Sequence, residues 1–155
     1  MRIIGDGGHA RAIQEILDEH ANAVDGTVIA IGDNAARKKV ISEHPMFYPP
    51  VISDKAIVSK GAFIGQGTVV MPGAIVRANA RIGRFVILNT GCTVDHDCII
   101  GDYAHIAPGA HLCGHVEVGE GALVGAGVCV APMGKIPAWS LAKMRRLEIV
   151  ALQGN

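Results

Sequence analysis

Residues 82–112 read IGRFVILNTGCTVDHDCIIGDYAHIAPGAHL, and an aliphatic residue returns at every sixth position of this segment. The same spacing holds over residues 52–135, where it recurs fourteen times without exception: Ile52, Val58, Ile64, Val70, Val76, Ile82, Leu88, Val94, Ile100, Ile106, Leu112, Val118, Val124 and Val130. A mostly small residue follows each of them four positions later: Ala56, Ala62, Thr68, Ala74, Ala80, Val86, Cys92, Cys98, Ala104, Ala110, Val116, Ala122, Val128 and Gly134. Helices repeat near 3.6 residues and strands near 2, so a sustained period of six predicts a parallel β-helix.

Stacked coils would bury these aliphatic residues in one continuous core, because no single hexad can cover its own apolar side chain. Three hexads make one triangular coil of 18 residues, and fourteen hexads therefore predict a prism of four to five coils. The small residues are expected at corners, where little room is left inside the prism.

Length and composition agree with such a fold. The chain has 155 residues, which is enough for one main domain and a small addition. Its 14 basic and 14 acidic residues cancel, so charge gives no argument for binding nucleic acid or an anionic membrane. No apolar run is long enough for a signal peptide or a membrane span. The four cysteines show no CxxC spacing, which predicts reduced thiols in a cytoplasmic protein.

The first 44 residues precede the hexads, and we expect a reduced α/β domain there. Residues 2–4 predict a strand, which runs through the turn GDGGHA at residues 5–10 into a helix. Residues 27–31 and 35–41 predict a second strand and a second helix. A strand, a glycine turn and a helix in this order can hold an anion on backbone amides, and the same turn also occurs without any ligand.

Prolines at three positions of residues 45–50 mark a linker, and the β-helix is expected over residues 51–135. After Val130 the repeat fades, and residues 139–152 predict a helix within a C-terminal region of residues 136–155. Such a helix would cap the open end of the prism and protect its strand edges.

A candidate site lies in the segment LNTGCTVDHDC at residues 88–98. Asp95, His96 and Asp97 fall outside the inward aliphatic register, which predicts that all three lie outside or at a corner. One coil is 18 residues, so His96 should lie beneath Gly114 and Asp97 beneath His115. A carboxylate beside an imidazole can orient a general base. Judged from these residues alone, a solvated corner is the favoured interpretation, because an exposed histidine with acidic neighbours is common.

Four segments together resemble a known family: GDGGHA at residues 5–10, AIGDN at 30–34, RKK at 37–39, and the hexads. They look like the nucleotide-sugar acyltransferases of the sialic acid O-acetyltransferase and bacillosamine N-acetyltransferase type, over about residues 2–130. The resemblance implies a left-handed β-helix that binds acetyl-CoA and an α/β domain that binds a nucleotide-sugar. It also implies a homotrimer with active sites between subunits, and acetyl transfer to an amine or hydroxyl of the sugar.

The resemblance assigns roles to individual residues. His96 matches the general base, Asp97 the residue that holds its imidazole, and Gly114 the backbone amide that meets the thioester carbonyl. The implied acetyl-CoA contacts are His105, Gly114 and Ala126, and the implied substrate contacts are Gly7, Gly8, His9 and Asn89. Acetyl-CoA is the expected co-substrate, and no metal is expected.

The sequence departs from the family in two places. The N-terminal region lacks the stretch that supplies a further strand, a helix and an acidic pair for the nucleotide in relatives. The predicted C-terminal helix replaces coils that hold the CoA tail in relatives.

Two alternatives to the acetyltransferase remain open at this point. One is a trimeric β-helix scaffold without catalysis, which the two departures favour. The other is a γ-type carbonic anhydrase with three histidines on a metal. That family pairs two histidines five residues apart, whereas His111 and His115 are four apart.

Overall fold

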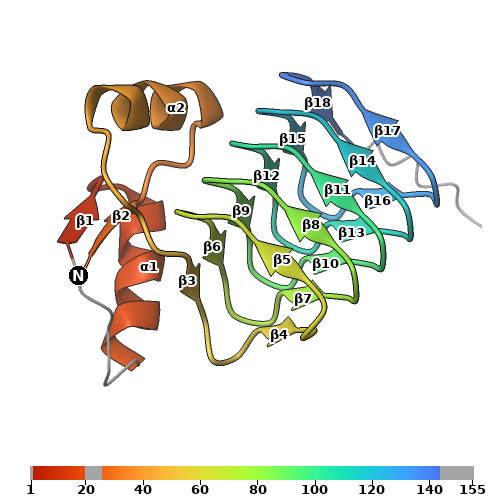
Figure 1. Cartoon of the computed structure of the whole chain (residues 1–155), viewed down its shortest axis with the longest axis horizontal. Helices are drawn as coiled ribbons and strands as arrows, with labels where there is room; N and C mark the ends of the chain where they lie inside the picture. The colour runs from red at the N-terminus through yellow and green to blue at the C-terminus, as the bar shows by residue number, and fades with distance from the viewer. Residues whose placement is uncertain (1, 20–25, 144–155) are drawn as a thin grey trace, which may run out of the picture.

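The computed structural model describes residues 2–19 and 26–143, which form a small N-terminal α/β unit and a long β-helix (Figure 1). Sixteen two-residue strands make the β-helix: β3 (Val51–Ile52), β4 (Ile57–Val58), β5 (Phe63–Ile64), β6 (Val69–Val70), β7 (Ile75–Val76), β8 (Arg81–Ile82), β9 (Ile87–Leu88), β10 (Thr93–Val94), β11 (Ile99–Ile100), β12 (His105–Ile106), β13 (His111–Leu112), β14 (Glu117–Val118), β15 (Leu123–Val124), β16 (Cys129–Val130), β17 (Lys135–Ile136) and β18 (Leu141–Ala142). The predicted parallel β-helix is therefore confirmed.

The strands form three parallel sheets that are the three faces of the prism. We name them face 1 (β3, β6, β9, β12, β15, β18), face 2 (β4, β7, β10, β13, β16) and face 3 (β5, β8, β11, β14, β17). Consecutive strands lie on successive faces, so one coil visits all three and the prism has about five coils. Val94 pairs with Val76 on one side and with Leu112 on the other, which confirms the spacing of 18 residues per coil.

The core follows from the hexad pattern. Each of the fourteen aliphatic residues is the second residue of a strand, and those from Val70 onward are buried. The small residues at the corners, such as Ala74, Ala80, Cys92 and Cys98, are fully buried beside them. Stacking therefore gives every coil the same cross-section, and the outward residues of each strand remain for function.

The corner that leads into face 1 shows how closely the coils approach one another. Phe85, Tyr103, Gly121 and Trp139 occupy equivalent positions on successive coils, and all four have positive φ. A Cβ at Gly121 would lie 2.3 Å from the Trp139 ring, so only glycine fits beneath this aromatic side chain.

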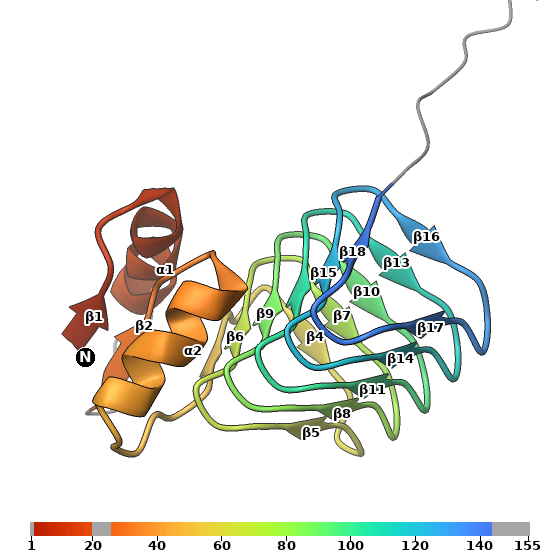
Figure 2. The same ribbon diagram turned by 90° about the horizontal axis from the view of Figure 1, so that it is seen from above.

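The N-terminal unit consists of β1 (Arg2–Ile4), α1 (Gly8–Glu19), β2 (Thr27–Ile29) and α2 (Asn34–Glu43). The predicted strands and helices are confirmed, and β1 and β2 form a two-stranded parallel sheet. Apolar residues of α1, including Ile13 and Ile16, pack in one cluster with Val51 and Val69 of the first coils. Figure 2 shows the N-terminal elements at the end of the prism where the first coil lies.

Two basic residues of α2 fasten this unit to the prism. The buried guanidinium of Arg37 donates to the carbonyl oxygens of Phe85 (2.9 Å) and Tyr103 (2.7 Å) on the β-helix. It also donates to the carbonyl of Ile31, 2.8 Å away at the end of the N-terminal sheet. The Lys38 ammonium lies over the rings of Tyr103 and Trp139, 5.5 and 5.0 Å from their centroids.

The prediction for the C-terminal region is wrong at its start. Trp139 lies in a corner, and β17 and β18 extend the β-helix to Ala142, where a helix from residue 139 was expected. The six-residue spacing in fact continues through Ile136 and Ala142. Pairing with the edges of β14 and β15 satisfies backbone groups that a helix would leave exposed. The rest of the predicted helix lies outside the described residues.

Both helices in the described part of the chain are too short and too polar to cross a bilayer.

Candidate active site

A cluster of polar side chains lies at the corner between β10 and β11. Val94 and Cys98 point into the core on either side of this corner and are fully buried. The three residues between them are therefore turned outward, and His96 is exposed. Asp97 adopts a φ of 57°, the left-handed conformation that a tight corner requires.

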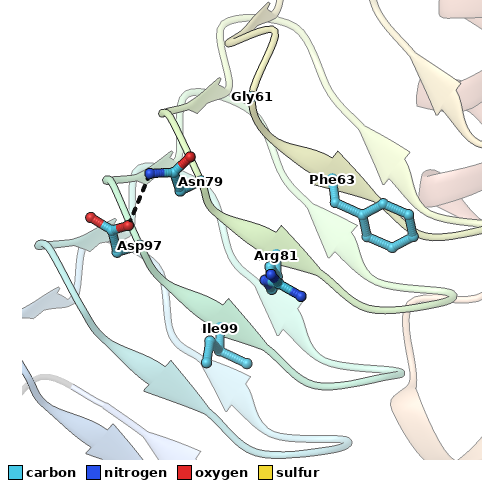
Figure 3. A pocket seen from close by; sticks show the side chains of 6 residues that line it. All are labelled: Gly61, Phe63, Asn79, Arg81, Asp97 and Ile99. Atoms are coloured by element: carbon cyan, nitrogen blue, oxygen red, sulfur yellow. Dashed lines mark hydrogen bonds between the residues drawn. The ribbon is translucent and has the colours of Figure 1, made fainter.

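His96 and Asp97 form a hydrogen-bonded pair. The Nδ1 atom of His96 lies 2.8 Å from Oδ2 of Asp97. The other carboxylate oxygen accepts a hydrogen bond from Nδ2 of Asn79, 3.2 Å away and one coil earlier (Figure 3). The bond from His96, followed by that from Asn79, lowers the pKa of Asp97. An ionised Asp97 accepts from Nδ1–H, which leaves the lone pair of Nε2 free to take a proton.

Gly114 lies against the His96 ring, as the 18-residue coil predicted. A Cβ at position 114 would be 2.7 Å from both Cε1 and Nε2 of His96. His115, the next residue, completes the corner: its ring meets that of His96 edge to face at 5.2 Å, and its Nε2 is 3.9 Å from Oδ2 of Asp97. The predicted position of Asp97 beneath His115 is thus confirmed.

Beside this corner runs an open groove of about 550 Å³, lined by Gly61, Phe63, Asn79, Arg81, Asp97 and Ile99 (Figure 3). Phe63 and Ile99, on the outer side of face 3, are 64% and 52% exposed. Asp97 therefore stands at the edge of a surface that combines apolar and charged side chains.

A second group of predicted site residues lies on face 1. Nδ2 of Asn89 donates to Nε2 of His105, 3.1 Å away, and the ring of His9 lies 6.3 Å from that of His105. Burial, with a smaller contribution from the positive charge of Arg37, lowers the pKa of His9 to about 4. Burial and then Arg37 likewise lower the pKa of His105 to about 4. Both imidazoles are therefore neutral at pH 7, and Nε2 of His9 is buried without a hydrogen-bond partner.

The remaining predicted contacts are spread around the molecule. Gly8 begins α1, and Gly7 precedes it, so both lie beside His9 at the N-terminus of that helix. Ala126 is exposed at the corner between β15 and β16, away from the corner that holds Gly114.

The two groups lie on opposite sides of the prism. His105 and Asn89 are on face 1, whereas the His96 corner is where faces 2 and 3 meet. Within a single chain, the structure does not bring His96 together with His9 or His105.

Two residues of these groups were missed in the sequence. Asn79 precedes Asp97 by one coil of 18 residues. The spacing that predicts Asp97 beneath His115 therefore also predicts Asn79 beneath Asp97. Arg37 was noted only as part of the RKK segment, and its role could not be foreseen because its contacts cross between the N-terminal unit and the prism.

Comparisons with known proteins agree with this architecture. The family described as bacterial transferase hexapeptide (six repeats) matches residues 97–132. A GDP-perosamine N-acetyltransferase of Escherichia coli O157:H7 is 32% identical over 105 residues, which are 66% of this chain and 48% of that protein. The chain thus spans about half the length of the curated relative it matches.

Two solved structures extend the similarity over most of the chain. The acetyltransferase domain of PglB from Neisseria gonorrhoeae FA1090, solved in complex with acetyl coenzyme A, is 30% identical with a TM-score of 0.82. PerB from Caulobacter crescentus, solved with CoA and GDP-perosamine, is also 30% identical, with a TM-score of 0.73. In each case the match covers 91% of this chain and 87% of the other.

The fold and these similarities define a left-handed β-helix of the acetyltransferase class, as the sequence resemblance implied. The chain belongs to the hexapeptide-repeat family of sugar acetyltransferases that includes these PglB and PerB structures.

Proposed function

We propose that the protein transfers an acetyl group from acetyl-CoA to the amine of a nucleotide-linked amino sugar. The observation that carries this proposal is the His96–Asp97 pair lying on the backbone of Gly114, in a chain similar to sugar N-acetyltransferases. GDP-perosamine is the first acceptor to test, because PerB was solved with it and the Escherichia coli relative is named for it.

The proposed chemistry needs one base and one site for negative charge. Nε2 of His96 takes a proton from the sugar amine as its nitrogen attacks the thioester carbonyl. Asp97 holds Nδ1–H and stabilises the imidazolium that forms. The backbone amide of Gly114 stabilises the oxyanion. As the C–S bond breaks, the imidazolium returns its proton to the departing CoA thiolate.

We propose that the working unit is a homotrimer, because one chain alone separates the two groups of site residues. In this arrangement the His96 corner of one subunit meets face 1 of its neighbour. His9, Asn89 and His105 would then complete the site, together with the amides of Gly7 and Gly8. The exposed Phe63 and Ile99 beside Asp97 support burial of this corner in an interface.

Acetyl-CoA would lie between the two prisms, near Gly114 of one and His105 and Ala126 of the other. The β-helix continues to Ala142, which supports this placement. Its last coil lengthens the prism surface available to the CoA tail, and a helix from residue 139 would have shortened that surface. A cytoplasmic location accompanies the proposal, and the four free cysteines support it.

The test combines binding with turnover. Purified protein is titrated with acetyl-CoA by calorimetry, its mass in solution is measured by light scattering, and release of the CoA thiol is followed with GDP-perosamine as acceptor. A matched acceptor with a hydroxyl in place of the amine separates N- from O-acetylation. We expect binding by a trimer and thiol release with the amine only. A folded trimer that binds no acetyl-CoA at millimolar concentration would contradict the proposal and favour a scaffold.

A further inference from the structure

The side chains of His96, Asp97 and His115 form a three-membered group whose possible ligand atoms all lie within 4.8 Å of one another. The group spans two adjacent coils, since His96 and Asp97 follow β10 and His115 follows β13. His115 takes no part in the acetyl transfer proposed above. The acetyl transfer therefore does not explain why His115 lies at this corner.

We propose that His96, Asp97 and His115 bind a divalent transition metal, Zn²⁺ in the first instance, and that the bound metal inhibits acetyl transfer. The inhibition of acetyl transfer rests on the proposed function, whereas metal binding at these three residues does not. Two imidazoles and one carboxylate, with an open fourth position, are a known zinc ligand set. The nitrogen ligands favour Zn²⁺ over Mg²⁺ or Ca²⁺.

The distances are close to those a metal needs. Zinc bonds of about 2.0–2.1 Å in tetrahedral geometry place neighbouring ligand atoms roughly 3.3 Å apart. Oδ2 of Asp97 lies 2.8 Å from Nδ1 of His96 and 3.9 Å from Nε2 of His115. The longest separation in the group, between the two imidazoles, is up to 4.8 Å, so the exposed side chains would have to draw together by roughly 1–1.5 Å to hold one ion.

Asn79 prepares the carboxylate for this role. Its amide donates to Oδ1 of Asp97 (Figure 3). The other oxygen, Oδ2, is the one that lies near the imidazoles of His96 and His115. Hydrogen-bond partners that orient metal ligands in this way contribute strongly to metal affinity. Asn79, Asp97 and His115 occupy equivalent corner positions with φ of 60°, 57° and 59°, so the backbone itself aligns them.

Inhibition follows from the tautomer of His96. The metal would replace the proton between Nδ1 of His96 and Oδ2 of Asp97, and the ring proton moves to Nε2. No net proton is gained or lost by the neutral ring. Nε2 then carries a hydrogen and has no lone pair, so it cannot remove a proton from the amine.

The test uses the full chain and ZnCl₂, titrated by calorimetry. Co²⁺ serves as a second probe, because its visible absorption reports tetrahedral nitrogen and oxygen ligands. We expect one metal per chain. His115→Asn, which suits the positive φ, should weaken Zn²⁺ binding at least about hundredfold, and Asn79→Gly about 10–100-fold. His111→Asn removes an exposed imidazole of the same coil that lies outside the group, and should leave affinity unchanged.

Activity is measured with and without Zn²⁺ for each variant, relative to its own metal-free rate. His115→Asn should need at least tenfold more Zn²⁺ for half-inhibition than the parent protein. Absence of binding, or equal weakening by His111→Asn and His115→Asn, would overturn the site. Zn²⁺ binding without loss of activity would overturn the proposal that the metal inhibits acetyl transfer. A protein inactive under all conditions would contradict the proposed function, while the calorimetry would still decide the metal site.

Discussion

The imidazole of His96 lies directly on the backbone of Gly114, one coil later in the prism. Any side chain at position 114 would occupy the space that the ring fills, since a Cβ there would be 2.7 Å from two ring atoms. The proposed base and the proposed oxyanion donor are thus held one strand spacing apart by stacking alone.

Gly114→Ala should displace the His96 ring and lower kcat about hundredfold, the scale of misplacing a catalytic group by about 1 Å. The free energy of unfolding should change by less than about 1 kcal/mol, because the exposed ring can rotate away. Steady-state kinetics and urea unfolding measure the two effects. Gly61→Ala is the matched control, since its Cβ would meet nothing closer than 3.6 Å. Equal activity of the two variants would contradict the role of Gly114.

His96→Ala should lower kcat by on the order of a hundredfold or more, because general-base catalysis contributes at least this much. Affinity for acetyl-CoA should stay close to that of the parent protein, as measured by calorimetry. His111 is an exposed histidine of the following coil, and the control variant His111→Ala should retain activity. An active His96→Ala variant would remove this residue from the mechanism.

Asn79→Gly should lower kcat by roughly tenfold with little change in KM for acetyl-CoA, because Asp97 loses a hydrogen bond that orients it. Glycine is chosen because position 79 has a φ of 60°, which glycine adopts without strain. Asp97→Asn should be more severe, since it removes the charge that stabilises the imidazolium. The reverse order of the two variants would show that Asp97 is not oriented through Asn79.

Stability should fall as the pH is lowered from about 6.5 to about 4. Burial lowers the pKa of His9 and of His105 from 6.5 to about 4 in the folded state. Between these values the unfolded chain binds more protons than the folded chain, so the free energy of unfolding falls as the pH is lowered. Above pH 6.5 both histidines are neutral in both states, and they no longer affect the free energy of unfolding.

Urea unfolding at several pH values checks this expectation. His105→Gln should flatten the pH dependence relative to the parent protein, whereas His111→Gln, at an exposed position, should not. Identical slopes for the parent and His105→Gln would contradict the buried neutral state of His105.

Arg37→Lys should lower the free energy of unfolding by about 3 kcal/mol. The guanidinium donates through Nε, Nη1 and Nη2 to carbonyls of both the N-terminal unit and the prism, and a lysine ammonium cannot reach them all. Arg77→Lys, at an exposed position, is the control. Thermal unfolding of the two variants measures the difference, and equal stability would show that Arg37 does not fasten the unit.

Much of the corner site could be predicted from the sequence. The 18-residue coil placed Gly114 over His96 and His115 over Asp97, because each strand of a β-helix repeats the path of the one before. Asn79 follows from the same rule. The end of the repeat was harder to predict, since Leu141 and Ala142 suit a helix as well as a strand, and only the exposed edges of β14 and β15 decided between them.

The sequence by itself determined the prism, its register and the group at the His96 corner, because the period of six is a local property that stacking repeats. Only the tertiary structure decided where the N-terminal unit sits. It placed His9 beside His105 and buried Arg37 between the unit and the prism, through contacts between residues as far apart as positions 9 and 105. No periodicity encodes such contacts, because they depend on two surfaces that meet only after each has folded.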